Sequence, residues 1–361
     1  MKFDEDQTLD RLEIVECNLG QLNFTFAQGA FNFIHISNNI LTVGHEKAMD
    51  LKAVENLELR NNVVQSLENG GKLSLSVESR VSIENNTFEN YDNETDFDIL
   101  DLEFGQSLQS VQITNSNLGR IKSNFMLDVT LSQMEMSFNK MKLDGENILA
   151  IVVKNFTFSN NQVEAVITEA FNVKVSDEML IINNNFEHIQ DKSFRGIRPQ
   201  SSSAKLSIIN NSLQSYEQGF KELDSKWSNV QLESIHLKVG CDCSLPEYLF
   251  DQIMSETENK WRQSLYCDGS GDETFTEPKN IFSYGQENCS DDDHLVIIIA
   301  GATVGVILIL ITIFLIFQKK VTRKMRAKVT SEAVQKFMVP ASSTLEHNVE
   351  GSYKYLWREE I

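Results

Sequence analysis

A short motif recurs along most of the chain: two apolar residues two positions apart, an asparagine three positions later, and another apolar residue two after that. Leu206, Ile208, Asn211 and Leu213 form one copy, and two further copies carry Cys17 and Ser116 at the asparagine position. The spacing of about 22 to 30 residues is typical of stacked repeats, which bury their apolar faces only against one another. We therefore predict an all-β solenoid of about nine to ten coils. The motif asparagines are Asn39, Asn62, Asn86, Asn139, Asn161, Asn184 and Asn211.

Two closures of the coil fit this repeat. Between the motifs, apolar residues alternate strictly, as in Phe171, Val173 and Val175, and period-2 alternation indicates a second strand in each coil. A second strand favours a right-handed parallel β-helix. The alternative is a leucine-rich-repeat horseshoe, whose L-x-x-L-x-L-x-x-N/C-x-L pattern several repeats fill. Both closures stack their strands in parallel and in register.

The recurring asparagines have a structural explanation in either closure. A turn buried between coils leaves backbone N–H and C=O groups that cost free energy if they stay unpaired. The asparagine amide offers both donors and an acceptor, so it can satisfy its own turn and bond to the coils above and below. We expect the seven asparagines to form a stacked ladder inside the solenoid.

Charge and hydropathy divide the chain between outside and inside. Leu295 to Phe317 is an uncharged run of 23 residues, long enough to cross a bilayer as one helix. Six basic residues follow it, and 9 basic against 5 acidic residues from Gln318 onward predict a cytoplasmic tail. The first 294 residues hold 23 basic and 47 acidic residues, a balance that argues against nucleic-acid binding.

Other features of the membrane topology follow from short motifs. The N-terminus is acidic and lacks the apolar region of a signal peptide, so we expect the sequence to begin downstream of one. Within the span, Gly301 and Gly305 form a G-x-x-x-G motif through which two helices could pair as a homodimer. The predicted location is the plasma membrane, with the N-terminus outside.

Four cysteines cluster after the last repeat, while Cys17 stands apart in the first. An even cluster ahead of a membrane span predicts two disulfides, with a zinc site as the alternative. The segment from Cys241 to Leu245 has the form C-D-C-x-L. Cys267 follows 24 residues after Cys243, and Cys289 a further 22 residues after Cys267. This arrangement resembles extracellular leucine-rich-repeat proteins with a cysteine-rich C-terminal cap. The chain is also similar in general character to arthropod cell-surface solenoid proteins.

The resemblance implies disulfides Cys241–Cys267 and Cys243–Cys289 and a short helix near residues 246–254. It further implies that residues 238–290 cap the solenoid of residues 1–237. An acidic stalk at 291–294, the span at 295–317 and a tail at 318–361 complete the predicted organisation.

Chemistry other than binding has little support in the sequence. No paired carboxylates, nucleophile motif or phosphate-binding loop stands out, so we predict no enzymatic activity and no cofactor or metal. Arg120 and Lys122, the only R-x-K motif in the repeats, are interpreted as a solvated pair. Six N-x-[ST] motifs predict a glycoprotein, with candidate sites at Asn23, Asn85, Asn93, Asn155, Asn210 and Asn288.

A long, regular solenoid outside the cell suits the binding of another protein. The leading hypothesis is an adhesion or recognition receptor for an extracellular protein ligand. The alternative is a membrane-tethered structural component of an extracellular matrix or apical surface.

Overall fold

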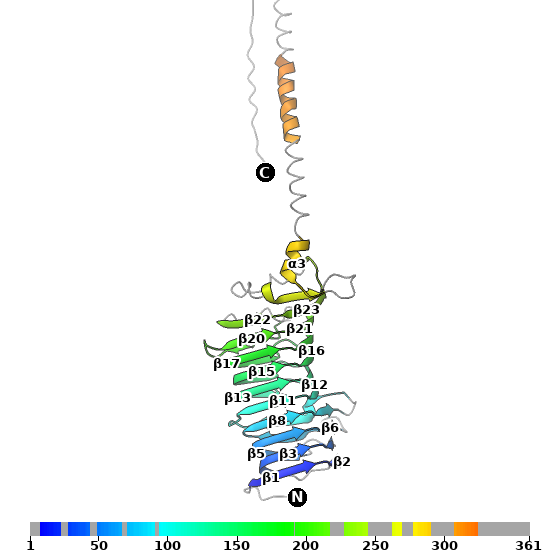
Figure 1. The fold of residues 1–361 in the computed structure, drawn as a ribbon, viewed down its shortest axis with the longest axis vertical. Coiled ribbons are helices and arrows are strands. Elements are labelled where there is room, and N and C mark those ends of the chain that lie inside the picture. The colour runs from blue at the N-terminus through cyan, green and yellow to red at the C-terminus, as the bar shows by residue number, and fades with distance from the viewer. Residues whose placement is uncertain are drawn as a thin grey trace, which may run out of the picture. The chain divides into compact units, whose positions relative to one another are not determined.

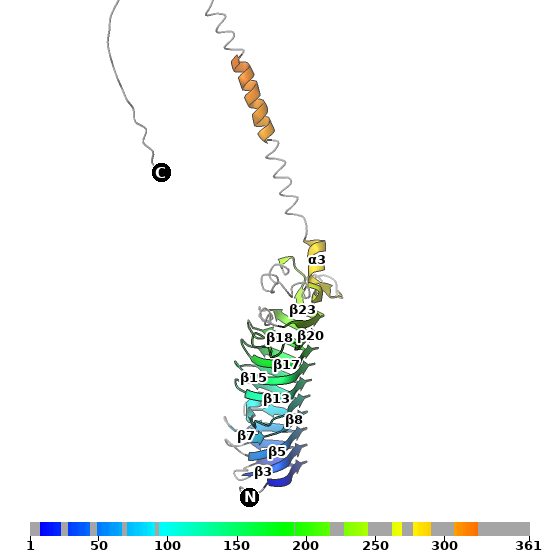
Figure 2. The same ribbon diagram turned by 90° about the vertical axis from the view of Figure 1, so that its left-hand side faces the viewer.

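In the computed structural model the chain separates into two units, Met1–Ser290 and Asp291–Ile361, and the first is a parallel β-solenoid (Figures 1 and 2). The structure describes residues 8–22, 28–43, 49–66, 71–90, 94–190, 192–216, 227–244, 262–268, 277–289 and 307–323. Within these residues the strands lie one above another along a single axis, from β1 up to the C-terminal cap (Figure 1). The predicted all-β solenoid is therefore confirmed.

Two sheets run along the solenoid. The first contains thirteen strands, and its main path, in order, passes through β1 (Thr8–Val15), β3 (Gln28–Ser37), β5 (Met49–Arg60), β8 (Arg80–Glu84), β11 (Ser110–Thr114), β13 (Met126–Ser137), β15 (Leu149–Ser159), β17 (Phe171–Ile182), β20 (Lys205–Ile209) and β22 (Asn229–Glu233). Beside this path lie β7 (Leu73–Val77), β10 (Leu100–Phe104) and β19 (Arg198–Pro199). All pairings in this sheet are parallel.

The second sheet contains twelve strands and takes up the chain after each motif turn. Its order is β2 (Asn18–Leu22), β4 (Ile40–Val43), β6 (Val63–Ser66), β9 (Thr87–Glu89), β12 (Asn117–Ile121), β14 (Lys140–Leu143), β16 (Gln162–Val166), β18 (Asn185–Ile189), β21 (Ser212–Tyr216), β23 (Ile235–Gly240), β24 (Leu265–Asp268) and β25 (Lys279–Asn280). Only the last pair, β24 with β25, is antiparallel among the described strands. A 3-10 helix, η1 (Phe97–Ile99), precedes β10, and α3 (Ile281–Asn288) follows β25.

The alternating runs between motifs are strands, but several are not separate ones. Phe171, Val173 and Val175 belong to β17, which continues without a break through the motif to Ile182. In place of a break, the strand pairing contains a local irregularity, such as the register shift between Val153 and Asn155 where β15 pairs with β17. An irregularity of this kind bends a strand without ending its hydrogen bonding. In other coils the strands do separate, as β7 and β8 do.

The core is made of files of apolar side chains, one from each coil. Val81, Val111 and Met134 lie in register on successive strands, and each is at most 2% exposed. Aromatic rings extend this stacking, since Phe158 packs on Phe186 at 6.2 Å between centroids. Burying each such side chain contributes roughly 1.5–3 kcal/mol. Because the apolar side chains of each coil are buried against those of the adjacent coils, the solenoid is stable only as a stack.

The motif asparagines stand in a single file at the turn between the two sheets. Each is at most 2% exposed and reaches back to the coil before it. Asn161 is representative: its Oδ1 accepts from the N–H of Asn139 at 3.0 Å, and its Nδ2 donates to the carbonyl of Met136 at 2.9 Å. Ser116 replaces asparagine through its hydroxyl, which accepts from the N–H of Asn86 at 3.1 Å. Cys17 starts the file by donating its N–H to Asn39 Oδ1 at 2.8 Å.

The C-terminal end of the solenoid is covered by a disulfide-bonded cap. Cys241 pairs with Cys267 and Cys243 with Cys289, the two bonds that the resemblance implies. Leu265 and Ile281 are 1% exposed, so the cap seals the core as well as the sheet edge. Among the described cysteines only Cys17 is free. The predicted helix at residues 246–254 lies outside the described residues.

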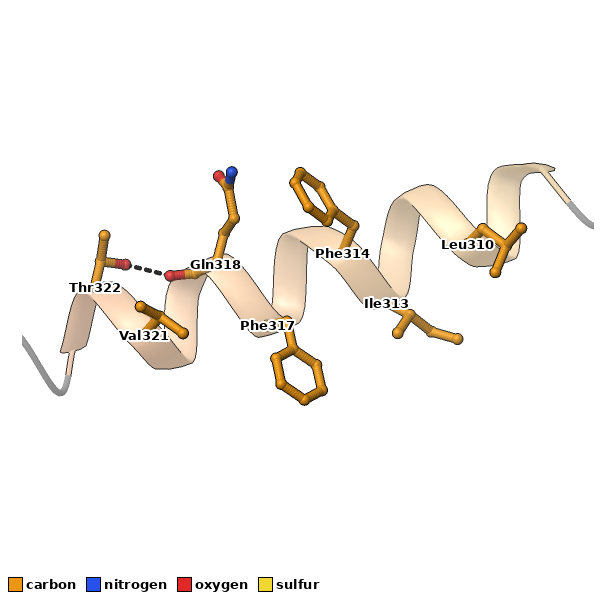
Figure 3. A pocket seen from close by; sticks show the side chains of 7 residues that line it. All are labelled: Leu310, Ile313, Phe314, Phe317, Gln318, Val321 and Thr322. Atoms are coloured by element: carbon orange, nitrogen blue, oxygen red, sulfur yellow. Dashed lines mark hydrogen bonds between the residues drawn. The ribbon is translucent and has the colours of Figure 1, made fainter.

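The second unit is described only as a helix over residues 307–323. Its large apolar side chains between Ile307 and Val321 are 45–66% exposed. Figure 3 shows the seven side chains of this helix that line a pocket, together with the 2.6 Å bond from the Thr322 hydroxyl to the Gln318 carbonyl. No helix within the described ranges is both long and apolar enough to cross a membrane. Residues 295–306 of the predicted span, with Gly301 and Gly305, lie outside those ranges.

The ladder predicts a large cost for one buried substitution. Asn161→Ala should lower the free energy of unfolding by about 2–4 kcal/mol, because the N–H of Asn139 and the carbonyl of Met136 both lose a partner. Asn161→Ser should lose less, since Ser116 already serves at this position. Urea denaturation of the full chain measures both, with Gln162→Ala at the adjacent exposed position as the control. Equal midpoints for Asn161→Ala and Gln162→Ala would contradict the ladder's role.

Candidate recognition surface

The turn between the two sheets exposes a second file of residues directly outside the ladder. In each coil the residue before the ladder position has a left-handed backbone, with φ between 50° and 56°. Asparagine tolerates this conformation better than other residues with a Cβ, because its short side chain bonds locally. The outer file consists of Glu16, Asn38, Asn61, Asn85, Asn115, Phe138, Asn160, Asn183, Asn210 and Ser234.

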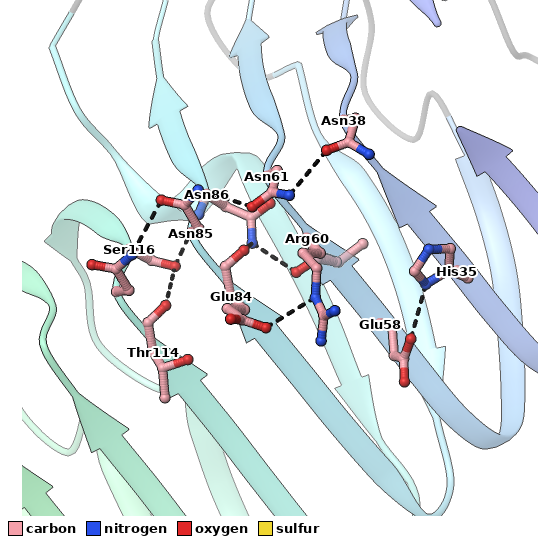
Figure 4. A network of polar contacts seen from close by, with 12 residues as sticks. His35, Asn38, Glu58, Arg60, Asn61, Glu84, Asn85, Asn86, Thr114 and Ser116 are labelled. Atoms are coloured by element: carbon pink, nitrogen blue, oxygen red, sulfur yellow. Dashed lines mark hydrogen bonds and ion pairs between the residues drawn. The ribbon is translucent and has the colours of Figure 1, made fainter. Parts of the chain in front are cut away.

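The outer asparagines bond to one another along the solenoid axis. Asn61 Nδ2 donates to Asn38 Oδ1 at 2.9 Å, and Asn85 Nδ2 donates to Asn61 Oδ1 at 2.8 Å (Figure 4). Asn115 continues this row with a 3.3 Å bond to Asn85. The outer file was not predicted from the sequence, although a signal is present: the residue before each ladder asparagine is itself often asparagine.

A second row of outer asparagines lies in the coils closer to the C-terminal cap. Asn183 Nδ2 donates to Asn160 Oδ1 at 3.2 Å, and Asn210 Nδ2 donates to Asn183 Oδ1 at 2.8 Å. Phe138 stands between the two rows. It is 62% exposed with φ of 56°, and its N–H donates to the carbonyl of Ser159 at 3.0 Å. An aromatic residue therefore holds the backbone of the turn but cannot continue the side-chain bonding.

Side chains beside the outer file form cross-coil pairs on the first sheet. His35 Nδ1 lies 2.8 Å from Glu58 Oε2, and Arg60 Nε lies 2.9 Å from Glu84 Oε2 (Figure 4). Ion pairs at a protein surface each contribute about 0–1 kcal/mol, so these pairs add little to the stability of the fold.

On the second sheet, basic residues gather on β12 and β14. Lys140 and Lys142 lie either side of the buried Met141, and Arg120 is the register neighbour of Lys142. No carboxylate of the described residues lies within 4.0 Å of either lysine ammonium. Lys140 is exposed and comes two residues after Phe138, on the outward side of the same turn.

The interpretation of Arg120 and Lys122 as a solvated pair was wrong. Both side chains form ion pairs with a loop, residues 94–98, that lies between β9 and β10. Arg120 lies 3.1 Å from Asp96 Oδ2, and Lys122 lies 2.7 Å from Asp98 Oδ2. The hydrogen bond to Asp96 raises the pKa of Arg120, and the one to Asp98 raises the pKa of Lys122. The Asp96 side chain is only 8% exposed. Spacing in the sequence could not reveal this contact, since the partners lie more than twenty residues apart.

Gly119 lets that loop approach β12 closely. Its φ is 60°, and a Cβ placed there would meet the carbonyl oxygen of Thr95 at 1.9 Å. The Thr95 carbonyl also accepts from the N–H of Arg120 at 3.0 Å. The loop is thus held by backbone contact as well as by ion pairs.

The predicted glycosylation sites fall into two groups. Asn85, Asn155, Asn210 and Asn288 are exposed, and Asn85 and Asn210 belong to the outer file. Asn23 and Asn93 lie outside the described residues. Glycosylation at the six N-x-[ST] motifs remains a prediction, and the asparagines of four of them are exposed to solvent.

The described part of the chain contains no group of three or more His, Cys, Asp or Glu side chains that could hold a metal ion. Comparison with protein-family models finds no match to this chain, and no curated protein matches it.

The close approach at Gly119 can be tested against a second glycine. Gly119→Ala should destabilise the protein by more than about 1–2 kcal/mol, because left-handed strain adds to the collision with Thr95. Gly240→Ala is the matched control, since a Cβ at Gly240 meets nothing within 4 Å. Thermal denaturation of the two variants measures the difference. A Gly119→Ala midpoint equal to that of Gly240→Ala would show that the loop does not sit against β12.

Proposed function

We propose that this chain is a non-enzymatic, single-pass cell-surface protein whose extracellular solenoid binds a protein ligand as an adhesion or recognition receptor. The observation that carries the proposal is the stack itself, in which parallel strands of successive coils place outward side chains in rows that are interrupted only by local register shifts. A rigid, regular surface of this kind can recognise a large ligand at little cost in conformational entropy.

The closure that best fits the coils is a right-handed parallel β-helix. Support comes from the second sheet, whose strands pair in parallel through the same coils as the first, as β14 does with β16. Crossovers between parallel strands are right-handed in almost all proteins, which favours that hand.

Membrane attachment through residues 295–317 is part of the proposal. The uncharged 23-residue run and the basic residues after it support a span with the tail in the cytoplasm. Apolar side chains exposed along residues 307–317 are suited to lipid. The two disulfides of the cap are typical of proteins that face an oxidising compartment.

A binding role rather than catalysis is supported by how the acidic groups are used. The most buried carboxylate of the described ion pairs, Asp96, is shared between Arg120 and Lys122 and secures a loop. Exposed carboxylates such as Glu58 and Glu84 pair with neighbours in the adjacent coil. Neither arrangement resembles two carboxylates facing a common substrate.

Proximity labelling on intact cells tests the proposal directly. The full chain, with a peroxidase fused at its N-terminus, should label surface proteins through a membrane-impermeant substrate. The control keeps residues 291–361 but carries an unrelated extracellular domain in place of the solenoid. We expect a set of labelled extracellular proteins that the control lacks. No labelling, or labelling identical to that of the control, would refute a ligand-binding solenoid at the cell surface.

A further inference from the structure

Phe138 is the one apolar residue of the outer file, and it combines a left-handed backbone with an exposed aromatic ring. It is the most exposed large apolar residue of the described solenoid, at 62%, compared with 54% for Leu127 and 43% for Ile40. Among the described residues with a positive φ it is also the only apolar one. Backbone strain and exposed aromatic area both cost stability, and such outliers gather at binding sites.

Folding does not require an aromatic ring at this position. Asparagine fills the same position in the coils on either side, as Asn115 and Asn160. An asparagine at 138 could join the two rows of side-chain bonds that Phe138 now separates. The ring therefore has no role in the core or in the ladder, and contact with a partner is the role that its exposure allows.

The surroundings of Phe138 indicate the charge of that partner. Lys140 and Lys142 follow it on β14, and neither has a carboxylate of the described residues within ion-pair distance. Elsewhere on the solenoid, Lys52 and Lys154 pair with acids of the next coil, Glu78 and Asp177. Two lysines without an ion pair to any described residue, on the strand that directly follows an exposed ring, stand out in a region (residues 1–294) with 47 acidic and 23 basic residues.

We propose that Phe138, Lys140 and Lys142 form a docking site for an acidic segment of a protein ligand. An aromatic or apolar side chain of that segment packs on the Phe138 ring, and its flanking carboxylates pair with the two lysines. Aromatic anchors provide much of the affinity at interfaces, while complementary charge speeds encounter and sets orientation. This assignment rests on the proposed function, because it locates the ligand site of the same solenoid.

Defined peptides test the site on the full chain in detergent micelles. The probe is a fluorescein-labelled heptapeptide of alternating Asp and Glu with a central Phe. One control peptide has Ser at the centre, and another has Lys and Arg in place of the acids. Fluorescence anisotropy should show binding of the acidic Phe peptide, weakened by added salt, and at least about tenfold weaker binding of both controls.

Variants of the chain then separate the two contacts. Phe138→Asn and the double variant Lys140→Glu with Lys142→Glu should each weaken binding of the acidic Phe peptide at least about tenfold. The matched controls Leu127→Asn and Lys154→Glu change an exposed apolar residue and a paired lysine elsewhere, and should leave binding unchanged. The urea midpoint of Phe138→Asn should be no lower than that of the parent chain, which excludes unfolding as the cause of lost binding.

Other results would overturn the assignment. Equal binding of the acidic Phe and acidic Ser peptides would remove the role of the ring. Loss of binding with Phe138→Asn but not with the lysine variant would show that the lysines do not pair with the peptide carboxylates, and would refute the acidic segment. If proximity labelling identifies extracellular partners while the peptide ignores these variants, the receptor proposal stands and only this site fails.

Discussion

The solenoid depends on one repeated interaction, the hydrogen bond from a buried backbone N–H to the asparagine amide of the next coil. The turn between the sheets is too short for its own backbone to satisfy these groups, and water does not reach them. Asn62, for example, accepts the N–H of Asn39 at 3.1 Å and donates to the carbonyl of Ile36 at 2.8 Å. The same contact fixes the register, because a slip of one residue would take the amide out of the core.

The need for a buried hydrogen-bonding side chain applies only to the ladder position, so the other residues of the turn can vary. The outer position needs only a left-handed backbone, which Asn85 adopts easily and which Phe138 and Glu16 also adopt. Likewise, the first residue of a second-sheet strand varies from coil to coil: Asn117, Lys140 and Gln162 are register neighbours, and the latter two are exposed. A fixed interior with a variable edge is how a repeat protein can acquire a recognition surface without losing its fold.

Features that repeat could be predicted from the sequence, whereas those that occur once or depend on backbone conformation could not. The ladder positions, including Ser116 and Cys17, follow from spacing alone, and the disulfides follow from a family resemblance. The continuous strand β17 did not, because alternation shows where strands lie but not whether a bend interrupts them. The contact of Arg120 with Asp96 and the strained Phe138 turn arise from an insertion and a substitution, for which the repeat offers no template.

Hydrogen exchange at the ladder turns tests the central claim most directly. Mass spectrometry of the full chain can follow the backbone amides of Asn139, Asn161 and Asn184, which donate to the next ladder residue at 2.9–3.0 Å. Turns exposed to water exchange quickly, whereas these amides should be protected as strongly as those of the strands on either side. Exchange at the rate of an unprotected loop would contradict a solenoid held together by its buried asparagines.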